Sequence, residues 1–265
     1  MTASVLSLRA SPCERLDMSG IDPSAFAAST PAEIAGLPIG MARGGPLLGD
    51  LFDIRIGDEA ALVIEGGSPR LDGLGQGLEA GTIRVVGDVG QLAGRGMTGG
   101  HLDIEGGAGP LAGSGMAGGS IRIGGDAGDR LGGPMPGEMA GMRGGQIVVR
   151  GDAGARAGDR MRRGTIIVAG SAAAYAGSRM IAGTLVVGGA CGAGVGQLMR
   201  RGTIVLAAAP ASVPASFVDN GVAEILFLRL LSRLVPDMPA LPSSLRRLAG
   251  DMTTIGKGEI LLPIA

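Results

Sequence analysis

Aromatic residues are scarce in this sequence. Its 265 residues include no Trp, one Tyr and four Phe, and all four Phe lie outside residues 61–208. The core of that central region must therefore be thin, because Ile, Val, Leu, Met and Ala cannot fill a broad interior at protein density. A thin, repetitive core is typical of stacked repeats, in which each unit contacts only its neighbours.

Side chains that carry catalysis are also few. The one histidine, His101, and the two cysteines, Cys13 and Cys191, supply neither a zinc ligand set nor a nucleophile paired with a base. Two cysteines also exclude the multi-bridge framework of small secreted domains. The single lysine, Lys257, lies in no phosphate-binding loop, which excludes a nucleotide site of the P-loop type. We therefore expect no catalytic residue, no metal and no cofactor in this chain, and we expect His101 to be a surface residue.

The sequence shows neither a charge excess nor a targeting segment. The formal net charge is −1, so no global field would attract nucleic acid or an anionic membrane. The first residues lack the charged start and the apolar run of a signal peptide. The most apolar segment, residues 222–235, carries three charged side chains and is too short to span a bilayer. We expect a soluble, cytoplasmic protein.

The sequence is rich in glycine and contains an internal repeat. Glycine supplies 52 residues, about three times its average share. Short runs rich in β-branched residues begin at positions 61, 82, 101, 120, 146, 165, 184 and 203, so successive intervals are 21, 19, 19, 26, 19, 19 and 19 residues. The runs alternate in the way of a strand with one buried face. Five equal intervals and two longer ones indicate stacked coils of 19 residues.

Each coil carries the same marker residues. A glycine closes the strand, and in three coils an aspartate follows it (Asp88, Asp126 and Asp152), which is typical of a turn in which Asp caps its own backbone. Cys191 stands where other coils carry Val or Ala, so we expect a small buried side chain. A methionine precedes six strands by four residues: Met97, Met116, Met142, Met161, Met180 and Met199. We expect this row inside the stack, where an unbranched side chain fills irregular space. The alternative, a soft-metal site, lacks accompanying Cys or His.

These features predict an all-β fold, a right-handed parallel β-helix built as a single-stranded solenoid of about seven 19-residue coils. The handedness follows from the rule for connections between parallel strands. A secreted calcium-binding roll is excluded because its repeat is nine residues long. We divide the chain into an N-terminal wrap or cap at residues 1–60, the β-helix repeat domain at 61–208, and a C-terminal linker, helix and tail at 209–265.

The two ends of the stack need covers, because the last coil on each side has open edges. Residues 1–60 hold five prolines and predict an irregular wrap, in which Asp50–Ile56 is a strand that starts the stack. Residues 222–235 have the apolar face of a helix, capped by Asp219 or Asn220, that either covers the last coil or docks to another subunit. The segment Gly256–Leu262 is expected to be an edge strand.

Two irregularities could bind a partner. A seven-residue insertion before Gln146 contains Pro134 and Pro136, and it is either a tolerated bulge or a contact site. Five arginines share two neighbouring coil positions on one corner: Arg143, Arg162 and Arg200 on the first, Arg163 and Arg201 on the second. Stacked guanidinium groups repel unless an anion lies across them. The corner is therefore either solvated beside acidic residues of this chain or a contact for a partner's acidic surface or an anionic ligand.

The coils resemble a known repeat domain. Residues 144–170, GGQIVVRGDAGARAGDRMRRGTIIVAG, resemble the GxGxG repeat domain shared by the glutamate synthase large subunit and the C subunit of formylmethanofuran dehydrogenases. The bacterial counterpart of the latter is the C subunit of the formyltransferase/hydrolase complex. The flanks GGPLLGDLFDI (44–54) and LRRLAGDMTTIGKGEILLP (245–263) resemble the one-carbon subunits. Of the two one-carbon subunits, the chain more closely resembles the one from the formyltransferase/hydrolase complex, because it is rich in arginine, poor in lysine and has no cysteine cluster.

The resemblance implies a role and partners. Such a chain would be a non-catalytic structural subunit of a hetero-oligomeric complex that moves formyl groups from tetrahydromethanopterin to a methanofuran-type carrier and on to formate, during formaldehyde oxidation. Other subunits would perform formyl transfer and zinc-dependent hydrolysis and would hold the zinc and the carrier. Such carriers bear glutamyl tails, so the arginine corner would be a contact for one. The alternatives are the C subunit of a molybdenum or tungsten formylmethanofuran dehydrogenase, a separate glutamate-synthase-type subunit, and a free-standing structural solenoid.

Overall fold

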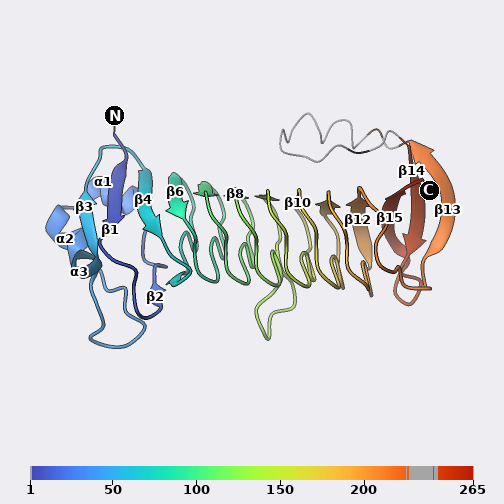
Figure 1. The fold of residues 1–265 in the computed structure, drawn as a ribbon, viewed down its shortest axis with the longest axis horizontal. Coiled ribbons are helices and arrows are strands. Elements are labelled where there is room, and N and C mark those ends of the chain that lie inside the picture. Colours follow the sequence, from blue (N-terminus) through green and yellow to red (C-terminus); the bar gives the residue numbers. More distant parts are fainter. Residues whose placement is uncertain (1, 225, 227–240, 242–243, 265) are drawn as a thin grey trace.

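The computed structural model describes residues 2–224, 226, 241 and 244–264. The central part of the chain forms a row of similar turns that lie side by side along the long axis of the molecule (Figure 1). One edge of every turn joins a single 13-stranded sheet with the order β13-β14-β15-β12-β11-β10-β9-β8-β7-β6-β4-β1-β3. The prediction of a mainly β chain is confirmed. No described helix is long and apolar enough to cross a membrane.

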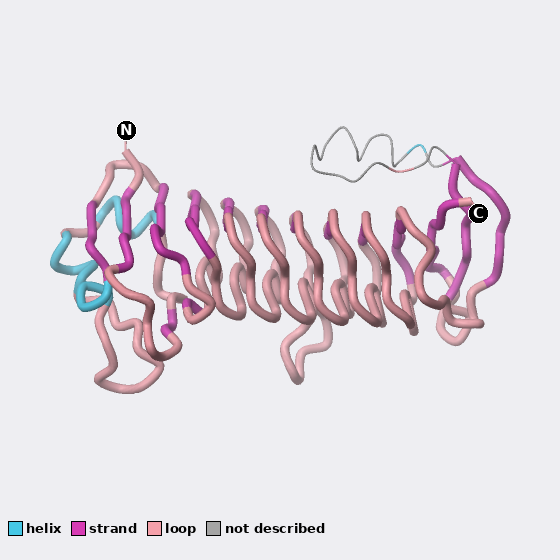
Figure 2. Tube along the Cα trace, viewed as in Figure 1, coloured by secondary structure: helices cyan, strands magenta, loops and turns pink. Residues whose placement is uncertain are grey.

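Eight consecutive strands of this sheet come from the predicted repeats, and all pair in parallel. They are β4 (Ala61–Gly67), β6 (Thr82–Gly87), β7 (His101–Ile104), β8 (Ser120–Ile123), β9 (Gln146–Val149), β10 (Thr165–Val168), β11 (Thr184–Val187) and β12 (Arg201–Leu206). Equivalent residues are partners, so Thr165 pairs with Thr184, and Thr184 with Thr203. The strands are short, and most of each repeat is loop (Figure 2).

The repeats also bond to one another away from the sheet. A second parallel ladder takes one residue from each of six repeats: Val89, Ala108, Ala127, Ala153, Ala172 and Cys191. Cys191 is 3% exposed, which confirms that it is a small buried side chain. All six methionines of the predicted row are fully buried in the same core. The stack is therefore tied together on more than one side, as its regular spacing requires.

The aspartates that follow the strand glycines cap the next repeat rather than their own turn, so the prediction of self-capping was wrong. Asp88 Oδ1 accepts from the backbone N–H of Gly107 at 2.8 Å, and Asp152 Oδ1 accepts from that of Ser171 at 2.6 Å. Stacking brings the donor of the neighbouring repeat within about one strand spacing of ~4.8 Å, close enough for a short side chain to reach.

Four of the strands are buried on both faces, whereas the sequence pattern predicted one buried face. In β9 to β12 the central residues Val148, Ile167, Val186 and Val205 are at most 5% exposed and form a second apolar cluster with Leu245 and Leu261. Residues Arg84, Asp103 and Arg122 at the same position of β6 to β8 are exposed. The outer face of the sheet is thus charged over its first repeats and apolar and buried over its last.

The N-terminal residues extend the sheet at one end. They form β1 (Ser4–Leu8), β2 (Leu16–Asp17), α1 (Pro23–Ala28), α2 (Pro31–Ala35), α3 (Leu48–Leu51) and β3 (Phe52–Arg55), and β2 pairs with β5 (Leu71–Asp72). The strand predicted at Asp50–Ile56 exists as β3, but it does not start the stack. β1 pairs in parallel with β4, and β3 pairs antiparallel with β1 at the outer edge.

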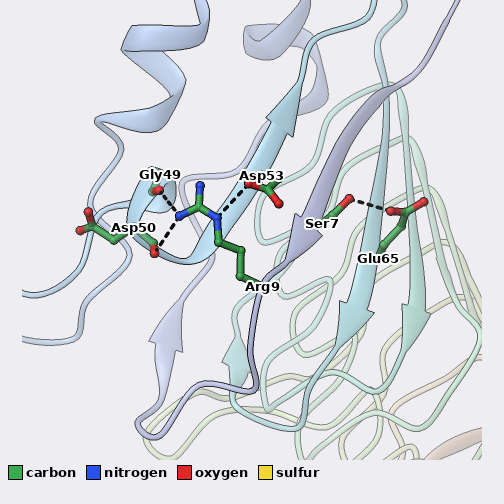
Figure 3. A network of polar contacts seen from close by, with 6 residues as sticks. All are labelled: Ser7, Arg9, Gly49, Asp50, Asp53 and Glu65. Carbon is green, nitrogen blue, oxygen red and sulfur yellow. Dashed lines mark hydrogen bonds and ion pairs between the residues drawn. The ribbon is translucent and has the colours of Figure 1, made fainter.

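Side chains fasten this end (Figure 3). Arg9 pairs with Asp53 of β3 at 2.8 Å and donates to the carbonyl oxygens of Gly49 and Asp50. Ser7 of β1 donates to the carboxylate of Glu65 on β4 at 2.6 Å. Contacts on both sides hold β1 between its two neighbours. The predicted boundary at residue 60 stays a prediction, because the sheet runs across it.

The C-terminal residues extend the other end with β13 (Val218–Glu224), β14 (Ser244–Gly250) and β15 (Lys257–Pro263). The helix predicted at 222–235 is wrong at its start, because Val222 to Glu224 pair with β14, and Asp219, the predicted cap, binds Arg246. The remainder of that helix, apart from residue 226, lies outside the described residues. The tail is not an edge strand either, since β15 pairs with both β12 and β14. The boundary at residue 208 likewise stays a prediction.

Candidate functional site

Four of the five arginines singled out in the sequence meet at one surface hollow. Arg162, Arg163, Arg200 and Arg201 line a hollow of about 500 Å³ together with Ile181, Ala182 and Ile255. All four arginines are exposed. The repeat therefore brings together side chains that lie up to 39 residues apart in the sequence.

The buried methionine row sets the position of these arginines. Each pair directly follows a fully buried methionine, Met161 or Met199. The backbone N–H of the residue after the methionine donates to the preceding repeat, as Arg162 does to the Met142 carbonyl at 2.8 Å and Arg200 to the Met180 carbonyl at 2.7 Å. With the methionine inside and the backbone bonded to its neighbour, the next two side chains face outward.

The two arginine pairs are not in adjacent repeats. Ile181 and Ala182 occupy the equivalent positions between them, so the pairs lie about two strand spacings apart, roughly 10 Å. That separation reduces the repulsion between the pairs and leaves an apolar strip in the centre of the hollow. A ligand that fills it would need negative charge on both sides of an apolar or flexible segment.

The C-terminal tail supplies one wall of the hollow. Ile255 belongs to a turn that is tied to the last repeat, where Thr254 Oγ1 donates to the Met199 carbonyl at 2.6 Å. Asp251 Oδ2 accepts from the backbone N–H of Leu198 at 2.9 Å. Burial raises the pKa of Asp251, but hydrogen bonds from Thr253, Ser216 and Leu198 outweigh it and lower the pKa below the ordinary value. The carboxylate that anchors this wall is therefore ionised at neutral pH.

No acidic residue lines this hollow, and the four arginines make no ion pair with any residue that the structure describes. Sequence reasoning missed a further cation, Lys257, which is exposed and stands opposite Arg201 where β15 pairs with β12. Its contribution could be found only once the tail was known to pair there. Two like charges on adjacent strands strengthen the local positive field.

Arg143 does not belong to this hollow, although it shares a repeat position with Arg162. It lines another hollow of about 320 Å³ with Gln76, Arg95, Ser114 and Glu138, among others. The insertion before β9 contributes Glu138 to this hollow, where its carboxylate lies 2.9 Å from Arg95. Arg143 directly follows Met142, whose carbonyl accepts from the Arg162 N–H, so the two arginines stand in adjacent repeats. That all five arginines act as one corner stays a prediction.

The remaining candidates lie apart from both hollows. His101 is exposed, as expected, and its Nδ1 lies 2.6 Å from Ser120 Oγ in the next repeat. In the portion of the chain that the structure describes, no three His, Cys, Asp or Glu side chains gather as metal ligands would.

Comparison with known proteins identifies relatives over nearly the whole chain. No family model matches. The C subunit of the formyltransferase/hydrolase complex Fhc of Methylorubrum extorquens is 54% identical over 265 residues, which cover 98% of this chain and 99% of that protein. This chain belongs to the Fhc C-subunit family. The resemblance inferred from the sequence is thereby confirmed.

The fold of the Fhc C-subunit family is matched as well. A chain in the X-ray crystal structure of the formyltransferase/hydrolase complex FhcABCD from Methylorubrum extorquens, in complex with methylofuran, superposes with a TM-score of 0.93. The two chains are 47% identical, and the match covers 98% of this chain and 100% of the other. Membership of this family favours the formyltransferase/hydrolase interpretation over the dehydrogenase and glutamate synthase alternatives.

Proposed function

We propose that this chain is the C subunit of a formyltransferase/hydrolase complex, in which it acts as a non-catalytic scaffold. The observation that carries the proposal is the 54% identity to the Fhc C subunit along essentially the full length of both chains. A chain of the same fold is part of the FhcABCD complex with methylofuran. In this role the complex would move formyl groups from tetrahydromethanopterin to a methanofuran-type carrier and on to formate.

The scaffold would be a right-handed parallel β-helix with one strand per coil. Two features support this geometry: the parallel register advances by one repeat at each step, and a second parallel ladder joins six repeats away from the sheet. Stacked repeats make a rigid rod, because each one is bonded to its neighbours along most of its length. A rod can hold two enzymatic subunits at a fixed distance.

The arginine hollow would hold an anionic partner group. Four guanidinium groups without an acidic partner among the lining residues favour a chain of carboxylates, because each carboxylate can accept two hydrogen bonds from one guanidinium. The glutamyl tail of a methanofuran-type carrier has this chemistry. Zinc and the reactive part of the carrier would lie in partner subunits, and the cytoplasmic location expected from the sequence remains part of the proposal.

Co-purification tests the assignment to a complex. The chain, tagged at its native locus and isolated from its source, should be recovered with the other three kinds of subunit and with formyltransferase and hydrolase activity. Recovery of the chain alone as a monomer would contradict the proposal.

Paired substitutions test the arginine hollow. In the isolated complex, Arg162→Ala with Arg163→Ala, and separately Arg200→Ala with Arg201→Ala, should lower the amount of carrier that survives purification. The difference from the native complex should shrink as salt is raised, because salt screens the exposed charges that the substitutions remove. The pair Arg43→Ala and Arg55→Ala removes two exposed charges elsewhere and serves as the control. Carrier retention equal to that of the control would refute the contact while leaving the assignment to the complex intact.

A further inference from the structure

One repeat contains a buried serine that binds a carboxylate of its own chain. Ser178 Oγ donates to Asp159 Oδ1 at 2.9 Å, and both residues are at most 3% exposed. Arg179 completes the arrangement with bonds of 2.9 Å from Nε to Oδ1 and 2.6 Å from Nη2 to Oδ2. A serine hydroxyl and a guanidinium thus share one carboxylate, and Asp159 comes from the repeat that precedes Ser178.

Ser114 occupies the same repeat position as Ser178 but has no such partner. Each serine follows the inward-facing glycine of its repeat, Gly113 or Gly177, whose N–H bonds to the preceding repeat. The equivalent residue before Ser114 is Arg95 rather than an aspartate, and the one after it is Gly133. Ser114 is fully buried, and its Oγ lacks a hydrogen-bond partner among the described residues. A buried hydroxyl without a partner destabilises the fold, because it has lost its hydrogen bonds to water without replacing them.

The surroundings of Ser114 already contain the guanidinium groups that a carboxylate needs. Ser114 lines the hollow of about 320 Å³ together with Arg95, Arg143, Gln76 and Glu138. Arg95 is paired with Glu138 at 2.9 Å, whereas Arg143 is exposed and makes no ion pair within the described part of the chain. The side chains that line the hollow therefore carry one positive charge in excess.

The Glu138 carboxylate already binds Arg95, so it would compete with any external carboxylate in this hollow. Glu138 belongs to the insertion, which projects from the row of repeats (Figure 1), and its backbone carbonyl accepts from Arg160 Nη1 at 3.0 Å. Its carboxylate also accepts from the backbone N–H of Met135 at 3.2 Å. Both the Arg95 and the Glu138 side chains are about one-third exposed, so an external carboxylate can exchange with Glu138 on Arg95 in the hollow that Ser114 also lines.

We propose that Arg95, Ser114 and Arg143 form a binding site for a small carboxylate ion, of the size of formate or acetate, which takes the place that Asp159 fills beside Ser178. The site does not depend on the proposed function, since it uses only residues of this chain. Glu138 gates it, because its carboxylate must leave Arg95 when the external carboxylate binds.

Titration of the full-length chain with acetate tests the site. The amide signals of Ser114 and Gly115, followed by nuclear magnetic resonance, should shift and saturate with sodium acetate but not with sodium chloride at equal ionic strength. Ser114→Ala and Arg143→Ala should each weaken acetate binding about tenfold or more, because a charge-assisted bond is lost. Glu138→Gln should tighten it several-fold, since the competing carboxylate is removed.

Ser178→Ala is the matched control, because it removes the equivalent hydroxyl from a repeat in which Asp159 already accepts its hydrogen bond. The acetate affinity of this variant should equal that of the native chain. Ser114→Ala should fold at least as well as the native chain, since it removes an unpaired buried group, so weaker binding cannot be ascribed to unfolding. Equal responses to acetate and chloride, or native-like acetate binding by Ser114→Ala, would overturn the proposal.

Discussion

Asp126 Oδ1 accepts a hydrogen bond from the backbone N–H of Asp152 at 2.8 Å, although 26 residues separate the two in the chain. Asp152 in turn accepts from Ser171, 19 residues further on. The insertion before β9 therefore lengthens the repeat in sequence without altering the contact between neighbouring repeats. Each of these carboxylates accepts a hydrogen bond from a backbone N–H of the next repeat.

Asp152→Ala should destabilise the stack, because it leaves the Ser171 N–H without its acceptor. The turn is exposed and water can replace part of the bond, so we expect a loss of about 1 kcal/mol, measured from the midpoint of urea unfolding. Glu79→Ala removes an exposed carboxylate for which the structure gives no such bond and should change stability by about 0.5 kcal/mol or less. Equal losses for the two variants would contradict the assignment.

Gly113→Ala and Gly115→Ala separate backbone strain from steric clash. Both glycines have positive φ, +68° and +67°, so an alanine at either should cost about 1–2 kcal/mol. A Cβ at Gly115 would meet nothing within 4 Å, whereas at Gly113 it would lie 2.3 Å from Ile147 Cδ1 in the core. Gly113→Ala should therefore lose about 1–3 kcal/mol more. Urea unfolding of the two variants measures this difference, and similar stabilities would refute it.

Acid should loosen the C-terminal tail through Asp251. Its pKa is lowered in the folded chain, because burial, which raises it, is outweighed by hydrogen bonds from Thr253, Ser216 and Leu198. A group whose folded pKa lies below its unfolded value of about 3.9 stabilises the fold above that pH, and the contribution is lost as the pH falls through the folded pKa. Native stability should therefore drop below about pH 4, and Asp251→Asn should flatten that dependence. Asp103→Asn, an exposed site on the sheet, is the charge-matched control; an unchanged slope in Asp251→Asn would disprove the role.

The two cysteines should differ in reactivity. Cys13 is exposed, whereas burial raises the pKa of Cys191 to about 11. Only the thiolate reacts readily with disulfide reagents, so the native chain at pH 8 should release one equivalent of thionitrobenzoate from Ellman's reagent and the denatured chain two. Cys13→Ser should abolish the native reaction. Two equivalents from the native chain would show that Cys191 is accessible.

Several features could be predicted because they depend on period alone. The strand intervals locate all eight central strands, and the small residues at the position of Cys191 together with the methionines before the strands identify two buried rows. In a stack of 19-residue repeats, a side chain that recurs every 19 residues lies next to the equivalent side chains of the neighbouring repeats. The four arginines of one hollow were found for the same reason.

Other features depend on partners that are remote in sequence. The alternating residues Ser4–Leu8 resemble many exposed segments, and nothing local shows that they pair with β4. Asp219 has the chemistry of a helix cap, yet its backbone pairs with β14 and its carboxylate forms an ion pair with Arg246. Arg143 shares the repeat position of Arg162, but it lines a hollow with a different set of side chains.

The sequence by itself determined the repeat, the rows that face the core, and the arginine-rich corner, because these follow from side chains that recur at a constant interval. The tertiary structure decided how the ends close the sheet, which aspartate caps which repeat, and how the arginines divide between two hollows. It also joined Ser178 to Asp159 of the preceding repeat. Many of these contacts join residues that lie far apart in the sequence, and only the folded backbone sets which of the many possible partners comes within hydrogen-bond distance.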